Sequence, residues 1–135
     1  MSLFARLEPI AFSALRIVAG AALFFHGAQK ILGWFATRAG PAAWTQVWVG
    51  GMIELVCGAL VAVGLFTRGA AFLASGTMAV AYIQFHWKLQ MTGGKFLPLV
   101  NQGELALIYC FLFLFVFAHG PGAASVDGLR RRKSR

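Results

Sequence analysis

The sequence predicts an all-α membrane protein, a bundle of four transmembrane helices with both termini in the cytoplasm. The composition, four long apolar stretches and the placement of the basic residues predict it. The chain has 135 residues, of which 59% are hydrophobic and only 12% are charged, against about 25% charged in an ordinary soluble domain. Four acidic and twelve basic residues cannot cover the large surface of a soluble domain of this size. The same composition argues against disorder, which requires low hydrophobicity.

The net charge of +8 concerns membrane topology and anionic lipid rather than nucleic acid. The basic residues are not interleaved on a polar face, as they are in a nucleic-acid binder. Basic segments beside a transmembrane helix are attracted to anionic headgroups. We therefore expect the lipid bilayer as a partner, and no nucleic acid.

The first two spans each carry charge. A transmembrane helix needs about 20 mostly apolar residues. The first candidate runs over residues 10–34, contains Arg16 and ends in the polar cluster of His26, Gln29 and Lys30. Its start also resembles a signal peptide, but we treat it as a span. The second candidate, residues 48–66, contains Glu54.

The third and fourth spans are predicted over residues 69–87 and 104–119. In the fourth, phenylalanines alternate at 111, 113, 115 and 117, a period typical of a strand. Only helices and closed barrels satisfy the backbone in lipid, and the chain has no partner strands for a barrel. We therefore expect a helix, and a single membrane domain over residues 1–135.

Short connections separate the spans. Gly40-Pro41 marks one turn, residues 64–70 form a tight turn, and residues 88–103 are the longest connection. Gly120-Pro121-Gly122 ends the fourth helix. A basic cytoplasmic tail follows over residues 123–135, where Ser125 or Asp127 is expected to cap a short last turn.

Basic residues predict the orientation, because cytoplasmic loops carry more Lys and Arg. Seven lie on the side of the N-terminus, the 64–70 turn and the tail, against four on the other side: Lys30, Arg38, Lys88 and Lys95. All four tryptophans, at positions 34, 44, 48 and 87, fall near the outer interface, as an aromatic belt should.

Polar side chains from all four spans are predicted at one level in the outer half. At the helical rise, His26 lies about 12 Å inward from Trp34 and Glu54 about 9 Å inward from Trp48. Tyr82 and His86 lie near the outer end of the third span. Glu104 opens the fourth. Ionisable residues within a bilayer are costly and indicate a site, so we predict one shared pocket.

Lys30 or His26 is the expected partner of Glu54, which a stripe of Gly50, Glu54 and Gly58 directs into the bundle. Small residues of this kind let helices approach closely. The pair admits a structural interpretation, in which it fixes helix register, and a functional one, in which it forms a ligand or redox pocket. A proton or ion relay is a third interpretation.

The remaining polar groups have other expected roles. Arg16 either snorkels or, as we favour, pairs with Asp127. Cys57 and Cys110 form no CxxC motif and are interpreted as buried small residues. His26, His86 and Glu54 lie on three helices, so no metal site is predicted. Glu8 has no assigned role.

Several segments together resemble the DoxX family of small membrane proteins. "RIVAGAALFFHGAQKILGWF" is similar to its first span, and "VGGMIELVCGALVAVGLFTR" to its second. His86 after an apolar third span, "GELALIY" at 103–109 and the ending "GPGAASVDG" complete the pattern. Carried over by position, the family's polar set is Arg16, His26, Lys30, Glu54, Arg68, His86, Glu104, Ser125 and Asp127.

The resemblance implies a multi-pass bundle in a prokaryotic cytoplasmic (inner) membrane. Some relatives are associated with thiosulfate:quinone oxidoreduction and others with thiol and oxidative-stress systems. The resulting hypothesis is a membrane subunit that binds a quinone or similar small amphiphile in support of a redox protein partner. Its expected ligand-binding residues are His26, Lys30, Glu54, Tyr82, His86 and Glu104.

In this hypothesis Glu54 and His26 bond the polar head of the ligand, Lys30 sets their charge, and Tyr82 and Trp87 line the pocket. Structural polar pairs are expected for Arg16, Arg68 and Asp127. The alternatives are a carrier or permease for a small or lipid-like molecule, and a structural membrane partner without a ligand. Exposed glycine and phenylalanine surfaces allow a homo-oligomer.

Overall fold

The computed structural model describes residues 3–133, and within that range the secondary structure is entirely helical. The all-α prediction is therefore confirmed. The elements are α1 (Leu3–Ile31), α2 (Gln46–Val63), α3 (Thr67–Ala81), the π-helix η1 (Tyr82–Trp87), the 3-10 turn η2 (Thr92–Gly94), α4 (Pro98–Asn101), α5 (Glu104–His119) and α6 (Val126–Lys133).

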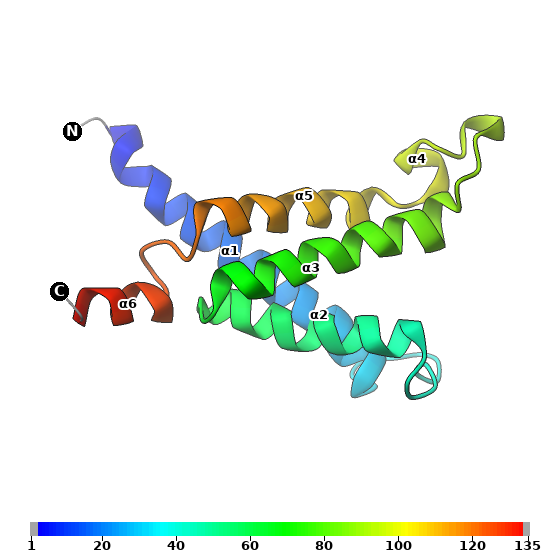
Figure 1. Cartoon of the computed structure of the whole chain (residues 1–135), viewed down its shortest axis with the longest axis horizontal. Coiled ribbons are helices and arrows are strands. Elements are labelled where there is room, and N and C mark those ends of the chain that lie inside the picture. The colour runs from blue at the N-terminus through cyan, green and yellow to red at the C-terminus, as the bar shows by residue number, and fades with distance from the viewer. Residues whose placement is uncertain (1–2, 134–135) are drawn as a thin grey trace.

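The four long helices α1, α2, α3 and α5 run up and down in chain order (Figure 1). α1 packs along α2, and α3 packs along α5. α3 also packs against α2, and this contact joins the two helix pairs. The first turns of α1 and the short helix α6 share one end of the described bundle (Figure 1).

The helix boundaries differ from the predicted spans where a backbone signal intervenes. α1 begins at Leu3 rather than at residue 10, and it ends at Ile31 because Gly33 takes a left-handed φ of 70°. α2 ends at Val63 rather than at residue 66, because Gly64 closes it in a left-handed cap with φ 73°. α5 has the predicted bounds.

Two described helices are long and apolar enough to cross a membrane by themselves: α1, with 29 residues, and α2, with 18. α5 is apolar but has 16 residues. The third predicted span consists of α3 and the π-helix η1 together.

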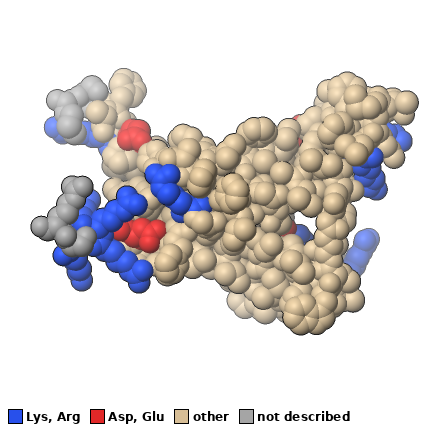
Figure 2. Space-filling view, in the orientation of Figure 1, with Lys and Arg blue, Asp and Glu red and all other residues tan. Residues whose placement is uncertain are grey.

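The core between the helices consists of small and medium side chains. Ala71, Ala74, Val61 and Phe113 are fully buried. Large apolar side chains lie outside, among them Phe72 and Phe111, which are 58% and 62% exposed. On the face shown in Figure 2, Lys and Arg gather toward the two ends, with a broad uncharged region between them. Such a surface is suited to lipid rather than to water.

Candidate functional site

Glycines bring the backbones of α1 and α2 into direct contact. A Cβ added at Gly27 would lie 2.2 Å from the backbone nitrogen of Leu55, and one at Gly58 would lie 2.4 Å from that of Phe24. The contact uses Gly20 and Gly27 on α1, and Gly51 and Gly58 on α2. The predicted stripe is therefore corrected in one position: Gly51 contacts α1, whereas Gly50 faces Thr77 of α3.

This close approach places Lys30 against Glu54. The Nζ atom of Lys30 lies 2.6 Å from Oε1 and 2.7 Å from Oε2 of Glu54. The Glu54 side chain is 5% exposed and that of Lys30 is 36% exposed. A buried carboxylate is costly unless it is paired and hydrogen-bonded, and one ammonium satisfies both oxygens here. Of the two predicted partners, the structure selects Lys30.

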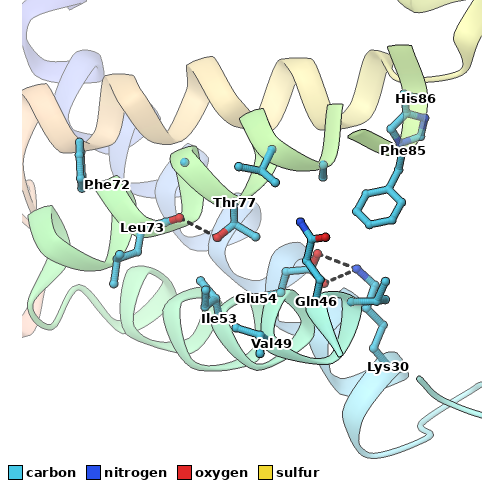
Figure 3. A pocket seen from close by; sticks show the side chains of 15 residues that line it. Lys30, Gln46, Val49, Ile53, Glu54, Phe72, Leu73, Thr77, Phe85 and His86 are labelled. Carbon is cyan, nitrogen blue, oxygen red and sulfur yellow. Dashed lines mark hydrogen bonds and ion pairs between the residues drawn. The ribbon is translucent and has the colours of Figure 1, made fainter. Parts of the chain in front are cut away.

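A groove of about 490 Å³ opens between α2 and α3 beside this pair; we call it the lateral groove. Its walls are apolar over most of their length, with Val49, Ile53, Phe72, Leu73, Val80 and Phe85. In Figure 3, Phe72 and Leu73 lie at one end, and Lys30, Phe85 and His86 at the other. The groove is thus amphiphilic along its axis.

A second, smaller cavity of about 220 Å³ lies on the other side of the pair, among α1, α3 and α5; we call it the inner cavity. His26, Gln102 and Tyr109 contribute polar atoms to it. The lateral groove and the inner cavity share Lys30, Glu54, Ala81 and His86 as lining residues. The ion pair and His86 therefore form the boundary between the two spaces.

The π-helix positions His86 at this boundary. η1 continues α3 without a break, and the backbone N–H of Lys88 donates to the carbonyl of Ile83, five residues back. Nδ1 of His86 lies 3.3 Å from the carbonyl oxygen of Asn101. A carbonyl only accepts, so this contact is a hydrogen bond in the tautomer that carries the proton on Nδ1, and that tautomer leaves Nε2 as an acceptor. π-turns occur frequently at functional sites.

A polar contact lies at the Lys30 end of the lateral groove (Figure 3). The amide Nε2 of Gln46, at the start of α2, donates to Oε1 of Gln84 in η1. Gln46 also lines the groove. Gln46 is not among the predicted site residues, although it lies eight residues before Glu54 and therefore within about 80° of it on the same helix.

The structure brings only part of the predicted ligand set together. Lys30 and Glu54 are in contact, and His86 lines the same two cavities. His26 lines the inner cavity edge-on to Tyr109, at a centroid distance of 6.4 Å, instead of pairing with Glu54. Tyr82 and Glu104 line neither the lateral groove nor the inner cavity.

The Tyr82 hydroxyl donates to the Phe96 carbonyl at 3.1 Å and accepts from Asn101 at 3.3 Å. Tyr82 thus fixes the connection after η1. Glu104 is exposed in the first turn of α5, where a carboxylate suits the positive end of the helix dipole. Within residues 3–133, no three His, Cys, Asp or Glu side chains gather as a metal site.

The family model of DoxX matches residues 11–87 of the chain. The chain belongs to the DoxX family. The match includes Lys30, Glu54 and His86, so the boundary between the two cavities lies within the family's shared region. Membership also makes this a membrane protein.

One curated relative of this DoxX chain is a protein of Haemophilus influenzae described as uncharacterized. It is 38% identical over 125 residues, which cover 90% of this chain and 92% of the relative. No solved structure matches the chain.

The opposite end of this DoxX bundle is organised by Arg16, whose side chain is fully buried. Nη1 donates to the carbonyls of Val61, at 2.5 Å, and Ala62, at 2.8 Å, and Nη2 donates to the Ala124 carbonyl. Nε has no hydrogen-bond partner among the described residues. Arg16 thus joins the last turn of α2 to the segment before α6.

Arg16 and Asp127, the expected pair, interact through their charges, but the hydrogen bonds of their side chains go to other groups. Asp127 accepts from the backbone N–H of Phe66 at 3.1 Å and from the N–H and hydroxyl of Thr67, both at 2.9 Å. Unpaired N–H groups at the start of α3 attract the carboxylate, and unpaired carbonyls at the end of α2 attract the guanidinium. Each charge therefore caps a helix.

Other polar groups at this end have similar roles. Arg68 donates to the carbonyls of Phe117, Ala118 and His119, the last turn of α5, at 2.5, 3.0 and 3.4 Å. The Ser125 hydroxyl accepts from the N–H of Gly128 and caps α6, as one of the two predicted residues should. Glu8, with no assigned role, lies 3.4 Å from Nε2 of His119.

The two cysteines are free and lie on different helices. Cys57 belongs to the buried core, and Cys110 packs against that core. The Ser75 hydroxyl donates to the Cys110 carbonyl at 2.8 Å. Their surroundings are those of packing residues.

Proposed function

We propose that this DoxX chain crosses the bacterial inner membrane four times, with its N-terminus and α6 in the cytoplasm. α2 spans about 27 Å, and α3 with η1 about 31 Å, at the helical rise, close to a hydrocarbon core of about 30 Å. Arg6, Arg68 and the bases of α6 lie at one end, and Lys88 and Lys95 at the other. The excess of positive charge supports the orientation.

We further propose that the lateral groove binds a small amphiphile of the quinone type. One observation carries this proposal: an apolar groove of about 490 Å³ ends on an ion pair with a buried carboxylate, and on an imidazole. Binding sites for small molecules are mostly apolar, with a few polar groups that fix orientation. The apolar tail would lie along α2 and α3, with the head at Lys30, Glu54 and His86.

The residues present fit such a head. The Lys30 ammonium is a donor for a carbonyl oxygen of the ligand. The Glu54 carboxylate and the acceptor nitrogen of His86 can receive a hydroxyl proton. A carboxylate near an imidazole can serve as proton donor and acceptor. A bound quinone would supply the electron-accepting chemistry, for a redox partner of the kind with which some DoxX relatives are associated.

A second candidate function is structural. Glu54 is fully paired by Lys30, which favours a role in fixing the register of α1 and α2, without a ligand. In that case the family's polar set would stabilise the bundle for a protein partner.

Titration of the purified protein with short-chain ubiquinone and menaquinone analogues tests the proposal. We expect saturable binding that Glu54→Gln weakens about tenfold, the loss expected for one hydrogen bond to a charged group. Lys95→Gln, an exposed change outside the groove, should leave binding unaltered. No saturable binding, or binding unchanged in Glu54→Gln, overturns the proposal. Flux of a lipid-like molecule across proteoliposomes without an electron donor would indicate a carrier.

A further inference from the structure

A second groove lies at the far end of the bundle from the ion pair. It has a volume of about 450 Å³ and is lined by Phe66, Thr67, Arg68 and Gly69, and by Asp127, Arg130 and Arg131 of α6. We call it the arginine groove. It shares no residue with the lateral groove or the inner cavity. The function proposed above does not use it.

The α6 wall of this groove is fastened to the bundle. Asp127 caps α3, its backbone N–H donates to the Gly64 carbonyl at 2.9 Å, and Arg16 holds the preceding Ala124. A Cβ at Gly64 would lie 2.4 Å from the Cβ of Ser125, so the two segments touch. The arginines of α6 are therefore held at a set position, unlike those of a flexible basic tail.

The charge of the groove suits an anion. Three arginines face one aspartate, and both oxygens of that aspartate are occupied by Phe66 and Thr67. Arg68 uses its two Nη atoms on the end of α5, so it contributes mainly its positive charge. Arg130 and Arg131 bring two more guanidinium groups, whose planar fork matches phosphate oxygens.

The groove also lies at the level where the apolar helices end. It begins three residues after the last residue of α2, and Arg68 caps the last turn of α5. Phe66, with 67% of its surface exposed, adds an apolar wall beside the arginines. Figure 2 shows basic side chains gathered at this end. A phosphate at this level with an acyl chain beside Phe66 has the chemistry of a phospholipid.

We propose that the arginine groove binds the phosphate of an anionic phospholipid of the cytoplasmic leaflet. The inference uses the membrane orientation proposed above but is independent of any ligand in the lateral groove. Anionic lipid attracts every basic segment near a membrane. Specific binding must therefore depend on the positions of the charges. α6 carries basic residues both inside and outside the groove, so the two sets can be compared.

The test is native mass spectrometry of the detergent-purified protein with phosphatidylglycerol, and with phosphatidylcholine as the uncharged reference. The double variant Arg130→Gln/Arg131→Gln removes two charges from the groove. Arg132→Gln/Lys133→Gln removes two charges from the same helix outside the groove. We expect the first double variant to weaken phosphatidylglycerol binding by about tenfold or more and the second to change it less than about twofold.

A second pair of variants keeps α6 intact. A side chain at Gly69 meets no atom within 4 Å, so Gly69→Glu and Gly69→Gln should both fold. Glu places a negative charge in the groove and should abolish phosphatidylglycerol binding, whereas Gln of the same size should retain most of it.

Equal losses in the two double variants, or equal behaviour of the two Gly69 variants, would show diffuse attraction and overturn the proposal. Displacement of the lipid by inorganic phosphate would assign the groove to free phosphate and overturn the lipid assignment. None of these variants touches Lys30 or Glu54, so the quinone titration is an independent result.

Discussion

A single ammonium, that of Lys30, lies within hydrogen-bond distance of both carboxylate oxygens of Glu54. The two residues lie on neighbouring helices that touch through glycine, and the same two residues border both cavities. The pair therefore belongs both to the helix packing and to the site.

Replacing one member of this pair should cost more stability than replacing both. Lys30→Met leaves the Glu54 carboxylate buried without a partner, which we expect to destabilise the protein by about 3–5 kcal/mol. Lys30→Met/Glu54→Leu removes both charges and should recover much of that loss. Thermal unfolding in detergent, followed by circular dichroism, measures the stability of both variants. A double variant less stable than Lys30→Met would contradict the expectation.

The glycine contact predicts a position-dependent effect of alanine. Gly27→Ala places a Cβ against the backbone of Leu55 and should destabilise by about 1–3 kcal/mol, as overpacking does. Gly76→Ala, on the open side of α3, gains helix propensity of about 1 kcal/mol and should be neutral or stabilising. Equal melting temperatures for the two variants would argue against direct α1–α2 contact.

Filling the lateral groove should separate binding from stability. Gly76 lines the groove with no atom near its Cβ, so Gly76→Leu occupies space meant for the ligand tail. We expect loss of quinone-analogue binding with an unchanged or raised melting temperature. Gly69→Leu, an equally open glycine on the same helix outside that groove, is the control, and it should bind normally. Normal binding by Gly76→Leu would place the ligand elsewhere.

Asp127 gives the structure a pH dependence at the end of the bundle that carries α6. Burial raises the pKa of Asp127, but hydrogen bonds from Thr67 and Phe66 and the charge of Arg130 together bring it below the ordinary value of 3.8. A depressed pKa contributes stability that is full above the unfolded pKa and is lost as pH falls through the folded pKa.

The difference in melting temperature between the wild type and Asp127→Asn should thus be constant above about pH 5 and shrink below pH 4, by linkage. Protonation of Asp127 at low pH removes the stability that its carboxylate contributes to the wild type. A difference that grows as pH falls would mean that Asp127 is not held as the carboxylate.

The helical fold and the shared depth of the polar side chains could be predicted from sequence. The length of an apolar segment and the depth of a residue within it depend only on spacing along the chain. The choice between His26 and Lys30 could not, because residues four apart point in nearly the same direction on a helix. The way α1 crosses α2 decides which of the two side chains reaches Glu54. Gly20 and Gly27 against Gly51 and Gly58 set a contact that turns Lys30 toward Glu54 and leaves His26 at Tyr109.

Arg16 and Asp127 show a different difficulty. Their pairing was inferred from opposite charge. The two charges lie near enough to interact, but the hydrogen bonds of each side chain go to a helix end instead. Helix termini offer several unpaired groups at once, and their positions depend on where α2 stops and α3 starts. That boundary is fixed by Gly64, two residues inside the predicted end of the span.

The π-helix η1 has a consequence for how such a site can change over evolution. In a regular α-helix, residues five apart point about 140° away from each other, so His86 would turn away from Ala81. The wider turn, with its bond from Lys88 to Ile83, directs both into the same two cavities. A regular α-helix over Tyr82–Trp87 at unchanged length would rotate His86 out of the boundary, although every side chain kept its identity. A segment one residue shorter between Ala81 and His86 would place the two four apart, about 40° from each other, and would need no π-helix. Among relatives, the length of this segment therefore carries information that a comparison of residue types alone would miss.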